Sequence, residues 1–427
     1  MFRRAFFRGL ALLFLFIHSA TTTLASGTRG DFNGDGKADI LWRNASSGAV
    51  YMMPMNGATV LPGTVFYTEP NPIWQIVATT DFDGDGKTDI LWWNSSLGLV
   101  YQMLMNGTTI KSQGMIYQEA DTNWRIVGTG DFNGDGKADI LWRNTSTGAV
   151  YMMPMNGATV LPGTVFYTEP NPAWQIAFIA DFDGDGKADI LWWNSSSGLV
   201  YQMLMNGATI KSQGMIYQEA DTNWRIVGTG DFNGDGKSDI LWRNASTGAV
   251  YMMPMNGATV LPGTVFYTEP NQTWQIVSVA DFDGDGKADI LWWNSSSGLV
   301  YQMLMNGAAI RSQGMIYQEA NTDWRIQPSK VTAAPAPVSV AILISPASSS
   351  LLPGQQQVFT ATVSGTTNTA VKWSCTGGTV TTNGIYTAPL VAGTYTVTAT
   401  SAQDISKLAS TSVTVSGRLT GQKPSCL

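Results

Sequence analysis

The chain has 427 residues, of which 44% are hydrophobic and 13% charged, and its 31 acidic residues outnumber its 24 basic ones to give a net charge of −7. This acidic balance argues against nucleic-acid binding, which depends on lysine and arginine. Two cysteines are too few for a disulfide-dense or cysteine-rich zinc scaffold, and the hydrophobic content is too high for a disordered chain.

Residues 1–25 have the pattern of a signal peptide. Arg3, Arg4 and Arg8 form a positively charged start, and residues 10–17 form an apolar run that is too short to span a bilayer. The Arg3-Arg4 pair also resembles a twin-arginine signal, but the strongly apolar run favours the general secretory route. We therefore expect a bacterial protein that is secreted, extracellular or at the cell surface, with no transmembrane segment in the mature chain.

The only histidine, His18, lies within this N-terminal segment. Cleavage after Ala25 would remove it. A mature chain without histidine cannot use a serine–histidine or cysteine–histidine nucleophile pair, nor a histidine-bound metal.

An acidic string, Asp-Phe-(Asn/Asp)-Gly-Asp-Gly-Lys, begins at residues 31, 81, 131, 181, 231 and 281, which gives a period of 50 residues. Alternate copies agree better than neighbours, because the odd repeats carry Leu-Trp-Arg-Asn where the even repeats carry Leu-Trp-Trp-Asn. The larger unit is therefore 100 residues long and occurs three times. Fixed periods of this length indicate a propeller or a solenoid.

Each repeat contains four short runs with the composition of β-strands. In the third repeat these runs are 124–127, 139–142, 149–153 and 164–167, with Asn156-Gly157 as a hairpin turn. No segment shows a sustained helical period. The pattern predicts an all-β fold, with a six-bladed β-propeller over residues 26–327. An open solenoid is the alternative.

The two ends of the repeat array are complementary. The first repeat lacks the Trp-x-Ile strand that precedes every other acidic string, and a spare copy, Trp324-Arg325-Ile326, follows the sixth repeat. We expect this copy to complete the first blade and to join the two ends of the ring.

The composition changes after the repeats. Residues 328–338 are rich in proline and alanine and are typical of a linker. Residues 339–417 carry little charge and alternate with period two, which predicts a small β-sandwich, and residues 418–427 form a tail. Cys375 and Cys426 could form one disulfide in an oxidising compartment or remain two free thiols.

The segment 339–417 resembles the bacterial group 2 immunoglobulin-like domains. The residues that carry the resemblance are Ile344-Ser345-Pro346, Pro353-Gly354, Phe359-Thr360-Ala361, Trp373, 384–389 and 393–397. This resemblance implies a spacer or adhesion module rather than a catalyst.

The acidic string has the oxygen spacing of a calcium-binding loop. In the first repeat, Asp31, Asn33, Asp35 and Asp39 occupy positions 1, 3, 5 and 9, and Lys37 at position 7 can offer its backbone carbonyl. The spacing matches the first half of an EF-hand, but the glutamate expected at position 12 is absent and the flanking segments are strands. The alternative is an acidic turn without metal, in which clustered carboxylates would repel one another in every copy.

We therefore predict up to six Ca²⁺ sites, since Mg²⁺ rarely uses an oxygen cage made only of protein groups. The candidate ligands are Asp31, Asn33, Asp35, Lys37, Asp39, Asp81, Asp83, Asp85, Lys87, Asp89, Asp131, Asn133, Asp135, Lys137, Asp139, Asp181, Asp183, Asp185, Lys187, Asp189, Asp231, Asn233, Asp235, Lys237, Asp239, Asp281, Asp283, Asp285, Lys287 and Asp289. Most of the acidic charge of the chain is then internal to these loops.

The repeats resemble the FG-GAP and VCBS repeats that build integrin-α-type β-propellers and many bacterial surface proteins. The resemblance rests on the acidic string in its six copies and spans about 300 residues. It implies that the loop residues at positions 1, 3, 5, 7 and 9 ligate Ca²⁺ in every repeat.

Tryptophan recurs at fixed positions. Trp42 and its copies are expected to pack between blades. Trp93, Trp193 and Trp293 differ, because arginine takes their place in the odd repeats, as at Arg43. A position that accepts both residue types suggests partial exposure, and an exposed indole could stack on a saccharide. The alternative is arginine packed over a tryptophan face.

An enzyme needs unlike residues in defined roles at one place. Here every candidate site occurs three or six times, and most carboxylates are assigned to metal, so we expect no catalysis. The leading hypothesis is a secreted, calcium-stabilised binding or adhesion protein whose partner is an extracellular glycan or a cell-surface protein. A carbohydrate-binding lectin that uses the exposed tryptophans and a polysaccharide-degrading enzyme are the alternatives, and a purely structural envelope role remains open.

Overall fold

The computed structural model describes residues 30–327, 341–364, 369–402 and 407–417, and all regular elements in these ranges are strands. These residues form two compact units, one within 30–327 and one within 341–417. The described ranges contain no helix that could cross a membrane. The predicted signal peptide (1–25), linker (328–338) and tail (418–427) lie outside them.

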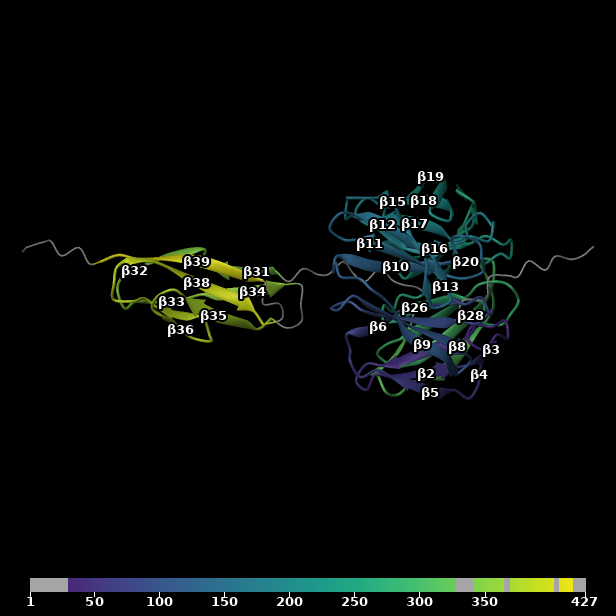
Figure 1. The fold of residues 1–427 in the computed structure, drawn as a ribbon, viewed down its shortest axis with the longest axis horizontal. Coiled ribbons are helices and arrows are strands. Elements are labelled where there is room, and N and C mark those ends of the chain that lie inside the picture. The colour runs from purple at the N-terminus through teal and green to yellow at the C-terminus, as the bar shows by residue number, and fades with distance from the viewer. Residues whose placement is uncertain (1–29, 328–340, 365–368, 403–406, 418–427) are drawn as a thin grey trace, which may run out of the picture. The chain divides into compact units, whose positions relative to one another are not determined.

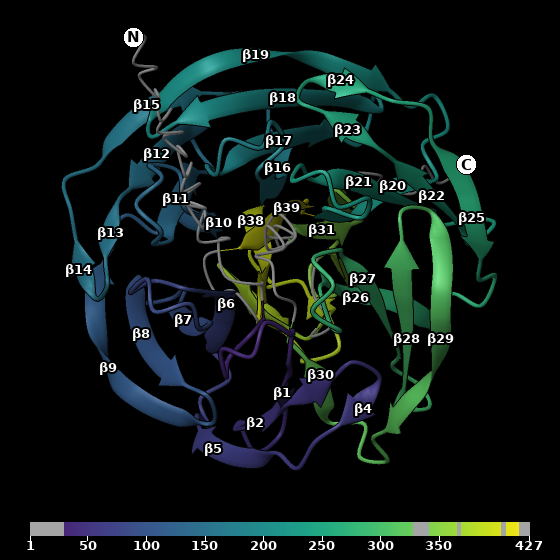
Figure 2. The ribbon, with the colours of Figure 1, turned by 90° about the vertical axis from the view of Figure 1, so that its right-hand side faces the viewer.

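The N-terminal unit is a β-propeller, in which six four-stranded antiparallel sheets follow one another around a ring (Figure 1, Figure 2). From the innermost to the outermost strand, the sheets are β30 (Trp324–Ile326), β1 (Ile40–Asn44), β2 (Ala49–Met53) and β5 (Thr64–Thr68); β6 (Trp74–Thr80), β7 (Asp89–Asn94), β8 (Leu99–Asn106) and β9 (Thr109–Gln118); β10 (Trp124–Gly130), β11 (Asp139–Asn144), β12 (Ala149–Met153) and β15 (Thr164–Thr168); β16 (Trp174–Ala180), β17 (Asp189–Asn194), β18 (Leu199–Asn206) and β19 (Thr209–Gln218); β20 (Trp224–Gly230), β21 (Asp239–Asn244), β22 (Ala249–Met253) and β25 (Thr264–Thr268); and β26 (Trp274–Ala280), β27 (Asp289–Asn294), β28 (Leu299–Asn306) and β29 (Ala309–Gln318). The all-β propeller fold predicted from the sequence is confirmed.

The first sheet takes its innermost strand from the end of the repeat array. β30 pairs with β1 in a register that places Ile326 opposite Trp42 and Trp324 opposite Asn44. The amide of Gln327 then donates to the carbonyl of Leu41 at 2.7 Å. The spare Trp-Arg-Ile copy therefore stands where the other sheets have their own first strand.

Odd and even sheets differ at their outer edge because of one proline. In the even sheet, β8 and β9 pair continuously, with Leu104 opposite Ser112. In the odd sheet, Pro54 stands at the place of Leu104, and proline has no N–H to donate to a strand ladder. The hairpin tips of the odd repeats therefore form separate two-stranded sheets, namely β3 (Met55–Asn56) with β4 (Thr59–Val60), β13 (Met155–Asn156) with β14 (Thr159–Val160), and β23 (Met255–Asn256) with β24 (Thr259–Val260).

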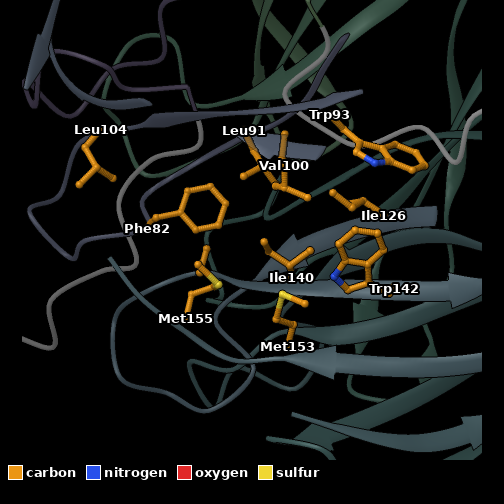
Figure 3. Close-up of a cluster of buried hydrophobic side chains, with 12 residues drawn as sticks. Phe82, Leu91, Trp93, Val100, Leu104, Ile126, Ile140, Trp142, Met153 and Met155 are labelled. Carbon is orange, nitrogen blue, oxygen red and sulfur yellow. The ribbon is translucent and has the colours of Figure 1, made fainter. Parts of the chain in front are cut away.

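The hydrophobic core lies between adjacent sheets. In one cluster, Leu91 and Val100 of the second sheet pack with Ile140 and Trp142 of the third, all at most 2% exposed (Figure 3). Trp42, expected to pack between blades, is buried in a cluster that joins the first sheet to the sixth. Burial of apolar surface thus holds each sheet to its neighbours.

The C-terminal unit contains three small sheets around one core. The sheets are β31 (Ala341–Ser345) with β34 (Thr360–Ser364); β32 (Ser348–Leu351), β39 (Leu408–Val415), β38 (Gly393–Ser401) and β35 (Val371–Cys375); and β33 (Gln356–Val358), β37 (Ile385–Thr387) and β36 (Thr379–Val380). Phe359, Tyr386, Val397 and Val413 are at most 1% exposed at its centre. The immunoglobulin-like assignment of this unit stays a prediction.

Candidate metal centre

Each acidic string forms the loop that precedes the second strand of a sheet. Gly34 and Gly36 have φ angles of +79° and +84°, which favour glycine, so the chain can fold back on Asp31. The Asp31 carboxylate accepts hydrogen bonds from the amide of Gly34 at 2.6 Å and from that of Gly36 at 2.8 Å. The first residue of the string therefore organises the turn from inside.

The carboxylate at position 9 ties the loop to the outer hairpin. Asp39 is 7% exposed, and it accepts hydrogen bonds from the amides of Phe32 at 3.1 Å and Met55 at 2.9 Å. Burial raises the pKa of Asp39 to about 7, against the opposing effect of these two amides. The same burial raises the pKa of its five copies, to about 7 for Asp89, Asp139, Asp189 and Asp289 and to about 6 for Asp239.

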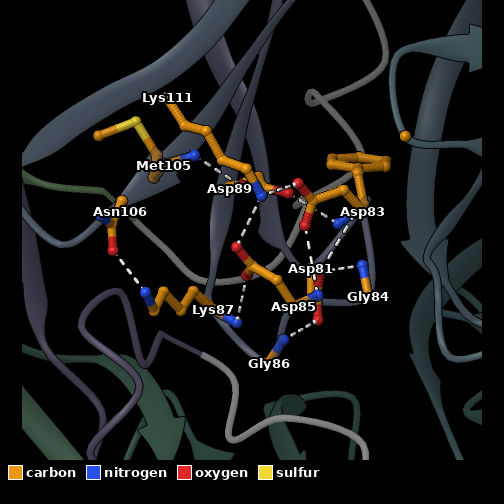
Figure 4. Close-up of polar contacts among 12 residues, drawn as sticks. Asp81, Asp83, Gly84, Asp85, Gly86, Lys87, Asp89, Met105, Asn106 and Lys111 are labelled. Atoms are coloured by element: carbon orange, nitrogen blue, oxygen red, sulfur yellow. Dashed lines mark hydrogen bonds and ion pairs between the residues drawn. The ribbon is translucent and has the colours of Figure 1, made fainter.

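Carboxylates gather most closely in the even loops. In each of these loops, three carboxylates place one oxygen within 4.8 Å of the others: Asp81, Asp83 and Asp85; Asp181, Asp183 and Asp189; Asp281, Asp283 and Asp285 (Figure 4). One oxygen of Asp283 is buried with no hydrogen-bond partner among the described residues. Clustered carboxylate oxygens with a spare acceptor are a donor set that suits a hard cation such as Ca²⁺.

In the odd loops an asparagine takes position 3. The Asn33 side-chain oxygen accepts from the amide of Asp35 at 2.9 Å, and its nitrogen donates to Asp39 at 3.5 Å. The amide of Lys37 donates to Asp35 at 3.0 Å, while its ammonium group turns to the side chain of Asn56 at 2.5 Å. The predicted ligands are thus held close together by hydrogen bonds, and the ammonium group of Lys37 binds the hairpin.

Three basic residues that were not predicted complete the even loops. The Lys111 ammonium lies 2.7 Å from Asp83 and 3.0 Å from Asp85 (Figure 4). Lys211 and Arg311 contact the equivalent pairs of carboxylates. The sequence carries a signal for this pairing, because lysine or arginine replaces leucine at this position only in the repeats that have four aspartates in the loop. The bridging ammonium occupies the kind of position that a metal cation would take.

Backbone hydrogen bonds join the six loops into a closed ring. At each junction the residue at position 8 of one loop donates to the carbonyl at position 1 of the preceding loop, over 2.7–2.8 Å. The pairs are Thr88–Asp31, Ala138–Asp81, Ala188–Asp131, Ser238–Asp181, Ala288–Asp231 and Ala38–Asp281. A second bond, such as Gly107 to the carbonyl of Phe32 at 2.8 Å, connects each loop to the hairpin of the next sheet. The loops therefore lie at the joints between blades.

Two of the three tryptophans expected to be partly exposed are buried. Trp93 and Trp293 are 6% and 7% exposed, whereas Trp193 is partly exposed, as expected. The guanidinium group of Arg125, from the next sheet, lies over the Trp93 ring at 5.3 Å. The expectation of exposure is therefore wrong for Trp93 and Trp293, because an arginine and the neighbouring sheet cover the indole face.

An arginine stacks on a tryptophan at every junction between neighbouring sheets, but these arginines and tryptophans come from two different positions in the repeats. The pairs, in ring order, are Arg43–Trp92, Arg125–Trp93, Arg143–Trp192, Arg225–Trp193, Arg243–Trp292 and Arg325–Trp293, with 5.0–5.4 Å between the guanidinium carbon and the ring centroid. Odd sheets supply both arginines and even sheets supply both tryptophans. This explains the arginine–tryptophan alternation seen in the sequence.

The predicted disulfide stays a prediction. Cys375 ends β35 as a free thiol within the described residues, and its proposed partner Cys426 lies outside them.

The repeats match the model of a known protein family. The FG-GAP-like repeat model matches residues 31–92, 81–142, 131–192, 181–242 and 231–292. The chain belongs to the FG-GAP-like repeat family. The matched region contains all six acidic loops, so the loop geometry described above is that of an FG-GAP-like repeat protein.

The similar solved structures are distant from this FG-GAP-like chain. A nidogen/laminin complex is 14% identical with a TM-score of 0.45, and the match covers 68% of this chain and 96% of that one. The calcium-binding protein regucalcin from Agrobacterium tumefaciens is 10% identical with a TM-score of 0.37, over 56% of this chain and 74% of that one. The dihydro-heme d1 dehydrogenase NirN is 8% identical with a TM-score of 0.34, over 91% of this chain and 76% of that one. No curated protein matches the chain.

Proposed function

We propose that this FG-GAP-like propeller is a secreted, calcium-stabilised, non-catalytic binding or adhesion protein that acts at or outside the cell surface. Its partner would be an extracellular glycan or a cell-surface protein, and the C-terminal unit would serve as a spacer or second contact. The observation that carries the proposal is the position of the acidic loops. They lie where neighbouring sheets meet, so a bound cation would stabilise the binding scaffold and would not take part in a reaction.

The charge of the loops supports a role for Ca²⁺. Asp31 and Asp39 are buried or nearly buried, and burial raises the pKa of both carboxyl groups. A divalent cation at the loop would offset this cost by stabilising the ionised carboxylates. Ca²⁺ would supply positive charge to six to eight oxygens, and extracellular calcium modules bind with a Kd of about 10⁻⁴–10⁻³ M, which suits an exported protein.

The repetition of the site supports binding over catalysis. Asp39 and its copies are engaged by backbone amides, and each loop is nearly the same as the loop two repeats away. The described residues contain no histidine, since His18 is the only one in the chain. A repeated scaffold without a distinct group of acid, base and nucleophile fits a protein that presents surface to a partner.

The test is a binding experiment with the full chain as it is exported. A glycan array and a pull-down with cell-surface material would each be run in Ca²⁺, in EGTA, and after Ca²⁺ is restored. Binding that disappears in EGTA and returns with Ca²⁺ supports the proposal. The absence of binding in both assays contradicts it. Release of sugars from plant or algal polysaccharides by the same preparation would contradict the non-catalytic assignment. Retention of the chain inside the cell would contradict secretion.

A further inference from the structure

The three even loops contain a cation supplied by the chain itself. Lys111 on β9 bridges Asp83 and Asp85 with its ammonium group at 2.7 Å and 3.0 Å, and its side chain is 47% exposed (Figure 4). Lys211 bridges Asp183 and Asp185 at 2.6 Å and 2.8 Å, and Arg311 reaches Asp283 and Asp285 in the same way. The arrangement therefore recurs in the second, fourth and sixth repeats.

The odd loops differ at two positions together. Their position 3 is Asn33 or a copy of it, in place of the aspartate of the even loops. The residue equivalent to Lys111 is Leu61, and likewise Leu161 and Leu261 in the other odd repeats. The additional negative charge of Asp83 thus appears only where an additional positive charge lies beside it. The ligand carboxylates and this basic residue give the same net charge in both loop types.

The lysine at position 7 does not pair with the additional aspartate of the even loops. Lys37 and Lys87 both direct their ammonium groups to an asparagine of the outer hairpin, Asn56 and Asn106, in odd and even repeats alike. Among the basic side chains of the described residues, those on the outermost strand of the even sheets form ion pairs with two loop carboxylates. Their effect is therefore specific to the even loops.

We propose that the propeller holds two classes of metal loop. In the odd loops a hard divalent cation such as Ca²⁺ is the only strong positive charge that the carboxylates can bind. In the even loops Lys111, Lys211 or Arg311 holds the carboxylates together without metal and competes with the cation for the same oxygens. This inference rests on the proposed calcium binding of the loops, and adds to it a difference in affinity between them.

The physical reason is direct competition for oxygen atoms. A Ca²⁺ ion that takes the oxygens of Asp83 and Asp85 must displace the ammonium group or lie within a few ångströms of it. Repulsion between a doubly and a singly charged ion about 4–5 Å apart, even at the dielectric constant of water, weakens binding by a factor of about ten or more. The odd loops face no such competitor.

The experiment is a calorimetric titration of the metal-free full chain with CaCl₂. The wild-type protein is expected to show two groups of three sites, with the even loops weaker because their basic residue must be displaced and their fourth carboxylate only partly offsets this cost. In the triple variant Lys111→Met, Lys211→Met, Arg311→Met, the weak group should become at least about tenfold tighter, because each even loop then has four carboxylates and no internal cation. The matched control is Leu61→Met, Leu161→Met, Leu261→Met, which should bind as the wild type does.

The outcomes separate this inference from the proposed function. Six equivalent sites in the wild type, or a weak group unaffected by the triple variant, would overturn the two-class inference and leave calcium binding intact. No calcium binding by any variant would overturn both. If the triple variant fails to fold, the wild-type isotherm and the single variant Lys111→Met decide the question, since one site should then leave the weak group.

Discussion

The backbone amide of Ala38 donates a hydrogen bond to the carbonyl oxygen of Asp281 at 2.7 Å, and so joins the first acidic loop to the last. The other five junctions have the same bond within a continuous chain, whereas this one connects the two ends of the repeat array. A cation that orders one loop therefore also orders the hydrogen bonds on both sides of it. Metal binding and ring closure are expected to support each other.

Removal of calcium should lower the melting temperature. With a Kd of about 10⁻⁴–10⁻³ M, 10 mM Ca²⁺ would stabilise the native state by about 1.4–2.7 kcal/mol at each occupied site. Differential scanning calorimetry in 10 mM CaCl₂ and in EGTA measures the difference, with MgCl₂ as the control for ionic strength and charge. Equal melting temperatures in all three conditions would contradict the metal assignment.

Asp39→Ala should destabilise the protein even without metal. The substitution leaves the buried amides of Phe32 and Met55 without their acceptor, which costs about 2–4 kcal/mol in the free energy of unfolding. Urea titration in EGTA at pH 5, where the folded protein keeps Asp39 protonated, isolates this effect from calcium binding and from the ionisation of Asp39. Asp35→Ala is the matched control, since it removes an exposed carboxylate of the same loop and should change stability by less than about 1 kcal/mol. Equal effects of the two variants would show that Asp39 has no structural role.

Trp93→Ala should unfold more easily than the wild type. The ring is 6% exposed and lies between Arg125 and Trp142, so its loss creates a cavity that costs about 3–5 kcal/mol. Chemical denaturation measures the change, and Leu97→Ala, at a side chain that is 57% exposed, is the control. A Trp93→Ala protein with wild-type stability would restore the exposed-tryptophan interpretation and, with it, the case for a saccharide platform.

Ile326→Ala tests the closing strand against internal references. Ile326 is 6% exposed, and its equivalents Ile126 and Ile226 are 2% and 8% exposed. If β30 completes the first sheet in solution, each of the three alanine variants should cost about 2–5 kcal/mol. The three free energies of unfolding are compared directly. A negligible cost at Ile326 beside large costs at the other two would mean that the ring is open at this point.

The metal-free protein should lose stability as the pH rises from about 4 to about 7. Burial raises the pKa of Asp39 to about 7 in the folded state, above its ordinary value of 3.8, so the folded protein binds more protons in this interval. The stabilising contribution is complete below pH 4 and is lost as the pH passes the folded pKa. Calcium requires ionised carboxylates, so the difference between melting temperatures in CaCl₂ and EGTA should widen from pH 5 to pH 8. A difference that is constant with pH would contradict this linkage.

Local patterns in the sequence were sufficient to predict the strands and loops. The runs at 139–142 and 149–153 became β11 and β12, and glycines of the acidic string take the positive φ angles that the turn requires. The position of the closing strand was also predictable, because Trp324-Arg325-Ile326 is a visible surplus copy. Each of these inferences depends only on residues close in sequence or on the repeat period.

Contacts between residues far apart in the sequence were harder to predict. Arg125 of the third sheet stacks on Trp93 of the second, and Lys111 reaches Asp83 across its own sheet, a pairing that shows in the sequence only as a coupled change at two distant positions. The tryptophan was therefore assigned too much exposure, although arginine packing was recognised as the alternative. The spacing of the acidic string predicts Asp39 as a metal ligand, but its bond to the amide of Met55 depends on how the hairpin folds back on the loop.

The arginine–tryptophan junctions require odd and even sheets to alternate around the ring. An odd sheet presents arginine on both sides and an even sheet presents tryptophan on both sides, as in the contacts of Trp92 and Trp93 with Arg43 and Arg125. Insertion or loss of a single repeat would bring two sheets of the same kind together, with arginine facing arginine or tryptophan facing tryptophan. Exchange of whole 100-residue units would preserve every junction, so we expect copy-number change in this array to occur in steps of two.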